Sequence, residues 1–426
     1  MIFKCDRESE FKFSVLPPLY MPFYNVWCAN AYYKYDAFSY DPFGISCSST
    51  SGSPVVIAGG KFFGFLNESG GSFSYDGKGV LTVKCSAGQE LYCNESCDPY
   101  EEWLKYNSLV TKNFELRENE DFWSTIEYCT WVDQKREAVQ QGSNNMQSCL
   151  NEKFVYDYMK RVEKMGLPKG KLTIDDGWDH SRGSTRIYGN WEIDRQKFPN
   201  MERLVRDMTD EGFIPGLWFA PFTFTPDCDL AMKYPQLIGN VWQKNSESGL
   251  NWMFIYPDPE LDAVLEKYYH DIFSYYISMG FRKLKLDISY GHKDKMKKLM
   301  KMIYGVVKGI DSTVEVEAHV PDIFVSRYCD TVRINDVSFD KPDWRAITME
   351  HYKVCRYSSS HKMLNLDHLG TNTPIPTESD FLEHSQMLLG LDGGYPCVSL
   401  LPDLFGKNAT DVFVKAINEW QERHGK

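Results

Sequence analysis

Carboxylates follow several short apolar runs in this sequence, and their spacing could support nucleophilic or acid/base chemistry. The run FRKLKLDISYG alternates, so that Lys285 and Asp287 face one side of a strand while Leu284 and Leu286 face the other. A lysine beside an aspartate keeps the carboxylate ionised, as a nucleophile requires. A structural ion pair at a strand end explains the same pattern equally well, so both interpretations stay open.

The run VRINDVSFD supplies further carboxylates, Asp336 and Asp340, together with Arg333. Two carboxylates that face each other across one site fit cleavage of a glycosidic bond. If configuration is retained, one attacks the anomeric carbon, and the other, about 5 to 5.5 Å away, protonates the leaving oxygen and then activates water. Arg333 either contacts a substrate hydroxyl or holds a carboxylate in a bidentate pair.

A third polar group follows the run LTIDDGW. Asp175 and Asp176 come directly after a strand-like segment, and a glycine turn and Trp178 follow them. These carboxylates can accept hydrogen bonds from sugar hydroxyls, although Asp-Asp-Gly is also a common turn. Trp218 lies at the end of another strand-like run, where its ring could form a wall against the apolar face of a sugar, and core packing is the alternative role.

These segments need a scaffold that brings several strand ends together. From about residue 120, short strand-like runs alternate with longer helical patterns, which predicts βα units and a parallel sheet. Eight candidate strands can be placed, at 125–131, 171–176, 213–219, 253–257, 282–288, 313–319, 331–336 and 362–367. Eight repeats predict a (β/α)8 barrel, a fold whose active site lies at the carboxyl ends of the strands. The link between strands six and seven is too short for a regular helix.

The rest of the chain predicts smaller units on either side of the barrel. Residues 1–115 carry short apolar runs broken by Gly, Ser and Asn, which indicates an N-terminal antiparallel domain resembling a β-sandwich. The barrel is expected over 120–395, and a helical tail over 396–426. That tail is too short for a large C-terminal sandwich.

Composition argues against several classes of function. The net charge is -12 and the basic residues are scattered, so neither nucleic acid nor an anionic membrane is an expected partner. The twelve cysteines include no CxxC pair, so no structural metal is predicted, and cleavage of a glycosidic bond by two carboxylates requires neither a metal nor an organic cofactor. The first residues, MIFKCDRESEFKF, contain no apolar stretch like that of a signal peptide, which predicts a cytoplasmic protein.

In the runs that carry the candidate site residues, the chain resembles the α-galactosidases of glycoside hydrolase family 36, and more distantly those of family 27. The resemblance covers roughly residues 120–390. Its most specific part is the ordered series DDGW, then GNWEID with KFP, then GLWFAP, and LKLDISYG is similar to the strand that bears the family's nucleophile. The resemblance implies a retaining mechanism and a (β/α)8 barrel.

The resemblance also implies roles for individual residues. Asp287 would be the nucleophile and Lys285 a sugar contact. RINDV resembles the acid/base motif with one residue deleted, which implies Asp336 as acid/base, Arg333 as a hydroxyl ligand and Asp340 as the alternative acid/base. Asp175 and Asp176 would bind the hydroxyls at C4 and C6 that distinguish galactose from glucose.

The chain departs from the family pattern in its sixth predicted strand. The family has a Cys-Gly turn there, whereas this chain has EAHVPD, which puts Glu317 and His319 near C2 of the sugar. Preference at C2 therefore stays open. We expect hydrolysis of an α-galactoside oligosaccharide or glycoconjugate; the alternatives are an α-N-acetylgalactosaminidase, an α-galactosyl transferase and, from another class, a barrel that binds carbohydrate without cleaving it.

Overall fold

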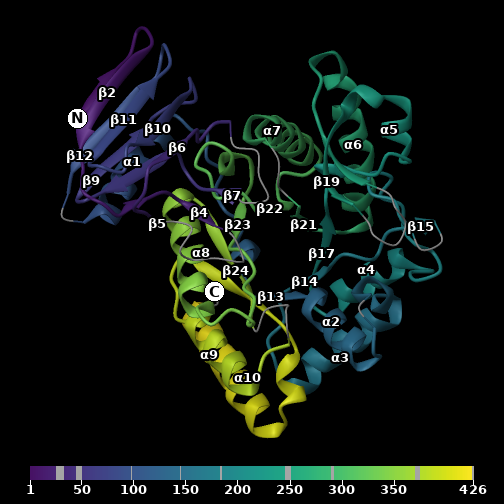
Figure 1. The fold of residues 1–426 in the computed structure, drawn as a ribbon. Helices are drawn as coiled ribbons and strands as arrows, with labels where there is room; N and C mark the ends of the chain where they lie inside the picture. The colour runs from purple at the N-terminus through teal and green to yellow at the C-terminus, as the bar shows by residue number, and fades with distance from the viewer. Residues whose placement is uncertain are drawn as a thin grey trace.

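The computed structural model describes residues 1–24, 33–44, 50–96, 98–143, 145–182, 185–244, 251–288, 292–369 and 375–424. Within these residues, eight parallel strands close into a barrel that occupies the centre of the molecule (Figure 1). In order around the barrel they are β13 (Glu127–Cys129), β14 (Lys171–Ile174), β17 (Ile214–Phe219), β21 (Lys283–Leu286), β22 (Glu315–Ala318), β23 (Thr331–Arg333), β24 (Met363–His368) and β25 (Gly394–Val398). The predicted fold class is confirmed.

Two details of the predicted barrel were wrong. The run at 253–257 falls largely in β20 (Asn251–Ile255), which belongs to an antiparallel sheet with β18 (Thr223–Phe224) and β19 (Ile238–Lys244) outside the barrel. The eighth barrel strand is β25, which the sequence analysis missed and which crosses the expected domain boundary at 395. Both runs are short and apolar, and such runs do not reveal which sheet a strand joins.

Helices surround the barrel and join its strands. In chain order they are α1 (Pro99–Thr111), α2 (Thr130–Gln140), α3 (Glu152–Met165), α4 (Met201–Asp210), α5 (Asp229–Lys233), α6 (Asp262–Met279), α7 (Lys293–Ile310), α8 (Trp344–Ser358), α9 (Glu378–Leu389) and α10 (Lys407–His424). Between β22 and β23 the described chain has only a short 3-10 helix, η6 (Ser326–Tyr328), as the short link predicted. Within the described part of the chain, no helix combines the length and apolar character that crossing a membrane requires.

Helix α3 illustrates how local sequence sets these elements. The side chain of Asn151 accepts a hydrogen bond from Phe154 N at 2.9 Å and so caps the first turn. Gly166, with φ of 70°, ends the helix in the left-handed conformation that glycine adopts without strain. The face turned to the barrel repeats at helical spacing and is buried: Val155, Tyr158, Met159 and Val162.

The described N-terminal region forms two larger antiparallel sheets, which lie on one side of the barrel (Figure 1), and a small sheet of β4 (Phe23–Tyr24) and β7 (Thr50–Ser51). One sheet has the order β1 (Ile2–Lys4), β12 (Glu90–Glu95), β9 (Lys61–Phe65), β8 (Val55–Ala58), β3 (Leu19–Tyr20) and β5 (Tyr33–Lys34). The other has the order β2 (Ser9–Ser14), β11 (Val80–Cys85), β10 (Gly71–Tyr75) and β6 (Phe38–Tyr40). The last part of the expected β domain is helix α1, whose Asn107 donates to Ser360 Oγ beyond the end of α8 at 2.8 Å.

The interior of the barrel is charged as well as apolar. Lys283 Nζ contacts Glu317 at 2.5 Å and also pairs with Glu127, while Lys171 Nζ lies 3.1 Å from Glu315. All five side chains are fully or almost fully buried. Charges at this depth are tolerated because each is paired and hydrogen-bonded, whereas the removal of one partner is strongly destabilising.

Close packing inside the barrel also constrains β17. A Cβ atom at Gly216 would lie 2.5 Å from Thr173 Oγ1 on the neighbouring strand. That hydroxyl donates to Glu127 Oε1 at 2.6 Å and so belongs to the charged interior. A glycine at this position therefore lets the two strands pair without displacing the network beneath the site.

Candidate active site

The carboxyl ends of the barrel strands surround a cavity of about 410 Å³. Its walls combine acidic, basic and aromatic side chains, as expected of a site that binds a polar ring with apolar faces. The lining residues are Trp131, Gln147, Asp175, Asp176, Tyr188, Trp218, Trp252, Lys285, Asp287, Ile288, His319, Arg333, Asn335, Asp336 and His368. The sequence analysis named eight of these residues as site candidates.

Asp287 directly follows β21, and its carboxylate is held on both sides. Its Oδ2 accepts a hydrogen bond from Trp218 Nε1 at 3.1 Å, and its Oδ1 accepts one from the backbone N–H of Ile288 at 2.8 Å. Ile288 has φ of 53°, which is costly for a β-branched residue. This strained turn fixes the orientation of the Asp287 carboxylate toward the cavity.

Positive charge keeps Asp287 ionised. Arg333 Nη2 lies 3.4 Å from Asp287 Oδ1, and Lys285 lies on the same strand face. Burial alone would raise the pKa of Asp287, but Arg333 and Lys285 outweigh it and the pKa falls well below the usual range. His319 Nδ1 is 3.7 Å away, and burial with the nearby Arg333 lowers the pKa of His319 to about 3, so its ring is neutral at pH 7.

Asp336 follows β23, and its pKa is shifted in the opposite direction. Burial and the neighbouring Asp367 carboxylate raise the pKa of Asp336 to about 6. Arg333 Nη1 lies 2.8 Å from Asp336 Oδ1, so one guanidinium contacts both Asp336 and Asp287. Two carboxylates in one site therefore differ in protonation, which is the arrangement that separates a nucleophile from a general acid.

Asp367 is a site residue that the sequence analysis missed. It lies near the end of β24 with φ of 58°, is almost fully buried and binds Arg333 Nη1 at 2.9 Å. Arg333 thus lies among three carboxylates, those of Asp287, Asp336 and Asp367. The signal was present, because the predicted strand 362–367 ends in an aspartate, and the predicted strands that carry Asp287 and Asp336 also have an aspartate at their last or next-to-last position.

Asp175 and Asp176 form the polar floor at the end of β14. Lys285 Nζ lies 2.6 Å from Asp175 Oδ2, which also accepts a hydrogen bond from Cys129 Sγ at 3.0 Å. Gln147 Nε2 donates to Asp176 Oδ2 at 2.9 Å, so Gln147 orients the second carboxylate. Both carboxylates line the cavity next to Asp287.

Three sequence predictions about side chains are corrected by their positions. Trp178 does not line the cavity: it is fully buried and donates from Nε1 to the carbonyl of Trp218 at 2.8 Å, so its role is packing. Asp340 accepts a hydrogen bond from Ser338 at 2.6 Å, its side chain is 54% exposed, and it lies outside the cavity lining. Glu317 points into the charged barrel interior and does not line the cavity.

Comparison with known proteins agrees with this geometry. The Melibiase family model matches residues 129–309. Alpha-galactosidase AgaA of Geobacillus stearothermophilus is 26% identical over 108 residues, which are 25% of this chain and 14% of that protein. Alpha-galactosidase Mel36A of Lactobacillus acidophilus is 27% identical over 94 residues, 22% of this chain and 13% of that protein. The matched segment is thus a small part of each relative.

Solved structures share the fold over nearly the whole chain. The crystal structure of GH36 alpha-galactosidase AgaA from Geobacillus stearothermophilus has a TM-score of 0.64 at 13% identity and covers 97% of this chain and 62% of that chain. TtGalA, an alpha-galactosidase from Thermus thermophilus in complex with stachyose, has a TM-score of 0.62 at 16% identity, with 85% and 79% covered. A GH31 alpha-xylosidase from a soil metagenome scores 0.67 at 11% identity, with 98% and 65% covered. The predicted resemblance to family 36 α-galactosidases is confirmed.

Proposed function

We propose that this melibiase-like barrel is a glycosidase that removes terminal α-linked galactose with retention of configuration. The observation that carries the proposal is the pair of cavity carboxylates, Asp287 and Asp336, which share Arg333 and whose pKa values are shifted in opposite directions. The names of the relatives support the choice of sugar, since AgaA and Mel36A are α-galactosidases.

In the first step Asp287, as the ionised carboxylate, attacks the anomeric carbon. The glycosidic bond breaks, its electron pair goes to the leaving oxygen, and protonated Asp336 donates its proton to that oxygen. A β-linked galactosyl ester on Asp287 results. In the second step Asp336, now ionised, takes a proton from water, which attacks the anomeric carbon and returns Asp287 as a free carboxylate.

The remaining cavity residues hold the ring. Asp175 and Asp176 accept hydrogen bonds from sugar hydroxyls, at C4 and C6 by the resemblance, and Lys285 can donate to a hydroxyl from its place beside Asp175. Trp218 provides an apolar face next to Asp287. The resemblance assigns Arg333 to a substrate hydroxyl, but its guanidinium contacts the carboxylates of Asp287, Asp336 and Asp367. We therefore assign Arg333 to positioning these carboxylates.

A second candidate concerns the substituent at C2. His319 lies 3.7 Å from the Asp287 carboxylate, so its neutral ring stands close to the carbon that Asp287 attacks and to the neighbouring C2. An α-N-acetylgalactosaminide is therefore the alternative substrate. Transfer of galactose to another sugar would use the same covalent intermediate.

The test uses nitrophenyl glycosides and azide. We expect the wild-type protein to release nitrophenol from the α-galactoside faster than from the α-N-acetylgalactosaminide, the α-glucoside or the β-galactoside. Asp287→Gly should be inactive and, with azide, should yield β-galactosyl azide, because azide replaces the missing nucleophile in a single displacement. Asp336→Ala should yield α-galactosyl azide, because azide then attacks the covalent intermediate.

The matched control is Asp340→Ala, which removes an exposed carboxylate from the loop that carries Asp336. It should leave the rate within about twofold of the wild type. If the two azide products carry the opposite configurations, the roles of Asp287 and Asp336 are reversed. Preference for the α-N-acetylgalactosaminide would reassign the C2 pocket, and no cleavage of any substrate would favour a barrel that only binds carbohydrate.

A further inference from the structure

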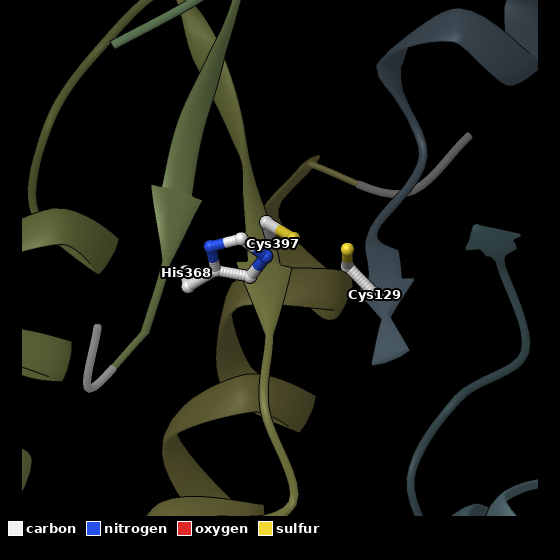
Figure 2. A group of neighbouring side chains, drawn as sticks. All are labelled: Cys129, His368 and Cys397. Atoms are coloured by element: carbon white, nitrogen blue, oxygen red, sulfur yellow. The ribbon is translucent and has the colours of Figure 1, made fainter. Parts of the chain in front are cut away.

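Three side chains with metal-binding atoms meet beneath the cavity. Cys129 ends β13, Cys397 lies on the adjacent strand β25, and His368 ends β24 on the other side of β25. One ligand atom from each lies within 4.8 Å of the others. Figure 2 shows the two sulfur atoms and the imidazole ring turned toward a common point. The residues are far apart in the sequence, so no spacing motif reveals them.

The imidazole is oriented as in known metal sites. Its Nδ1 lies 3.1 Å from the Asp367 carboxylate, and its other nitrogen, Nε2, is turned toward the sulfur atoms (Figure 2). His368 is 1% exposed, yet among the described residues Nε2 has no hydrogen-bond partner other than the sulfur it faces. A carboxylate that holds one ring nitrogen while the other binds a metal is the usual support for a histidine ligand.

We propose that Cys129, Cys397 and His368 bind a zinc ion or another thiophilic divalent cation. Two cysteines and one histidine form a donor set found in zinc sites. In a tetrahedral site with ordinary bond lengths, ligand atoms lie about 3.5 to 3.8 Å apart. The three atoms already lie within 4.8 Å, so they reach this spacing by side-chain shifts of about 1 Å.

The surrounding charges allow this ion. Binding requires two thiolates and a neutral imidazole, so a divalent ion replaces at least two protons and adds no net positive charge. The ammonium group of Lys285, whose Nζ lies 3.6 Å from Cys129 Sγ, is therefore not repelled by any additional net positive charge when the ion binds. Asp175 Oδ2 accepts a hydrogen bond from Cys129 Sγ at 3.0 Å but is already paired with Lys285 Nζ at 2.6 Å, so the fourth position is left to a water molecule.

The cavity provides the route by which the ion enters. Asp175 and His368 both line it, so an ion can pass from solvent to the sulfur atoms without opening the barrel. The proposal does not depend on glycoside cleavage. A metal here would bind directly under the cavity, and its occupancy can be measured without an activity assay.

The first test is titration of the reduced, chelator-treated full-length protein with Co²⁺. We expect one equivalent to bind with a thiolate-to-cobalt charge-transfer band in the near ultraviolet and the intense visible bands of tetrahedral cobalt, and Zn²⁺ should displace both. Cys129→Ser and Cys397→Ser should each lose the charge-transfer intensity or reduce it by half. Cys149→Ser, which changes a buried cysteine in η3 (Met146–Cys149), should bind as the wild type does.

A second measurement keeps the proposal testable if a cysteine variant does not fold. Asp367→Asn should weaken Co²⁺ binding about 10- to 100-fold, because Asp367 orients His368 without contacting the ion. The proposal is overturned if wild-type protein shows no charge-transfer band, or if Cys129→Ser keeps the wild-type spectrum. A Cys129–Cys397 disulfide that persists in the folded protein under reducing conditions would also overturn it.

Discussion

The substitution Asp367→Asn removes the charge of Asp367 and keeps its shape. It should change the pH dependence of kcat/KM. A carboxylate oxygen of Asp367 lies within 4.8 Å of one of Asp336. At an effective dielectric constant of about 20, two unit charges at that distance repel by about 3.5 kcal/mol, or roughly 2.5 pKa units. Because Arg333 lies against both carboxylates and offsets part of this repulsion, we expect a shift of about one to two units.

The direction follows from the charge that is removed. The pKa of Asp367 is well below its usual range, so Asp367 is ionised across the working pH, and burial together with the negative charge of Asp367 raises the pKa of Asp336 to about 6. Asparagine at position 367 removes that charge. Asp336 then loses its proton at lower pH, so the general acid that we propose is lost earlier as pH rises.

The assay is kcat/KM for the nitrophenyl α-galactoside as a function of pH. For the wild type, kcat/KM should begin to fall near pH 6 as pH rises, which is the alkaline limb of the profile. In Asp367→Asn this limb should move about one to two pH units toward acid. Asp340→Asn is the control, because its exposed carboxylate should leave the limb in place. A folded Asp367→Asn protein whose alkaline limb coincides with that of the wild type would refute this account of how Asp336 is tuned.

Three further predictions concern the nucleophile, the barrel and its pH stability. Trp218→Phe removes the 3.1 Å hydrogen bond to Asp287, worth about 1.5 to 3 kcal/mol to a charged acceptor, and steady-state kinetics should give a kcat/KM about 10- to 100-fold lower. Gly216→Ala places a Cβ 2.5 Å from Thr173 Oγ1 and should lower the free energy of unfolding in urea by about 1 to 3 kcal/mol. Burial lowers the pKa of His384 to about 4, so between pH 6.5 and pH 4 only the unfolded state binds a proton at this residue. His384 should therefore lower the free energy of unfolding by about 1.4 kcal/mol for each pH unit as pH falls through this range. Thermal unfolding of His384→Phe should show a weaker dependence of stability on pH.

The barrel was predictable because its signal repeats along the chain. Alternation within FRKLKLD correctly put Lys285 and Asp287 on one side of a strand, and both line the cavity. Local patterns do not specify the partner of a strand, so the run at 253–257 was placed in the barrel and β25 was missed. Pairing depends on contacts between residues far apart in sequence, which periodicity does not encode.

The site was predictable where a side chain directly follows a strand. The sequence favoured Asp336 and kept Asp340 as the alternative, and the packed loop places Asp336 in the cavity and leaves Asp340 exposed. Trp178 follows Asp176 by two residues in the sequence, but the turn after β14 directs the indole into the core. Cys129 and His368 lie close together only because the barrel closes and brings the strands that carry them to the same place.

The ion pairs inside the barrel also determine how the barrel can fold. Lys171 and Lys283 lie on β14 and β21, whereas Glu315 and Glu317, their partners, both lie on β22. An N-terminal half ending at β21 would bury two lysines against the single carboxylate of Glu127, and a C-terminal half would bury two carboxylates without a lysine. Each half therefore lacks ion pairs that only the complete barrel supplies, so we expect the two halves to fold together as one cooperative unit.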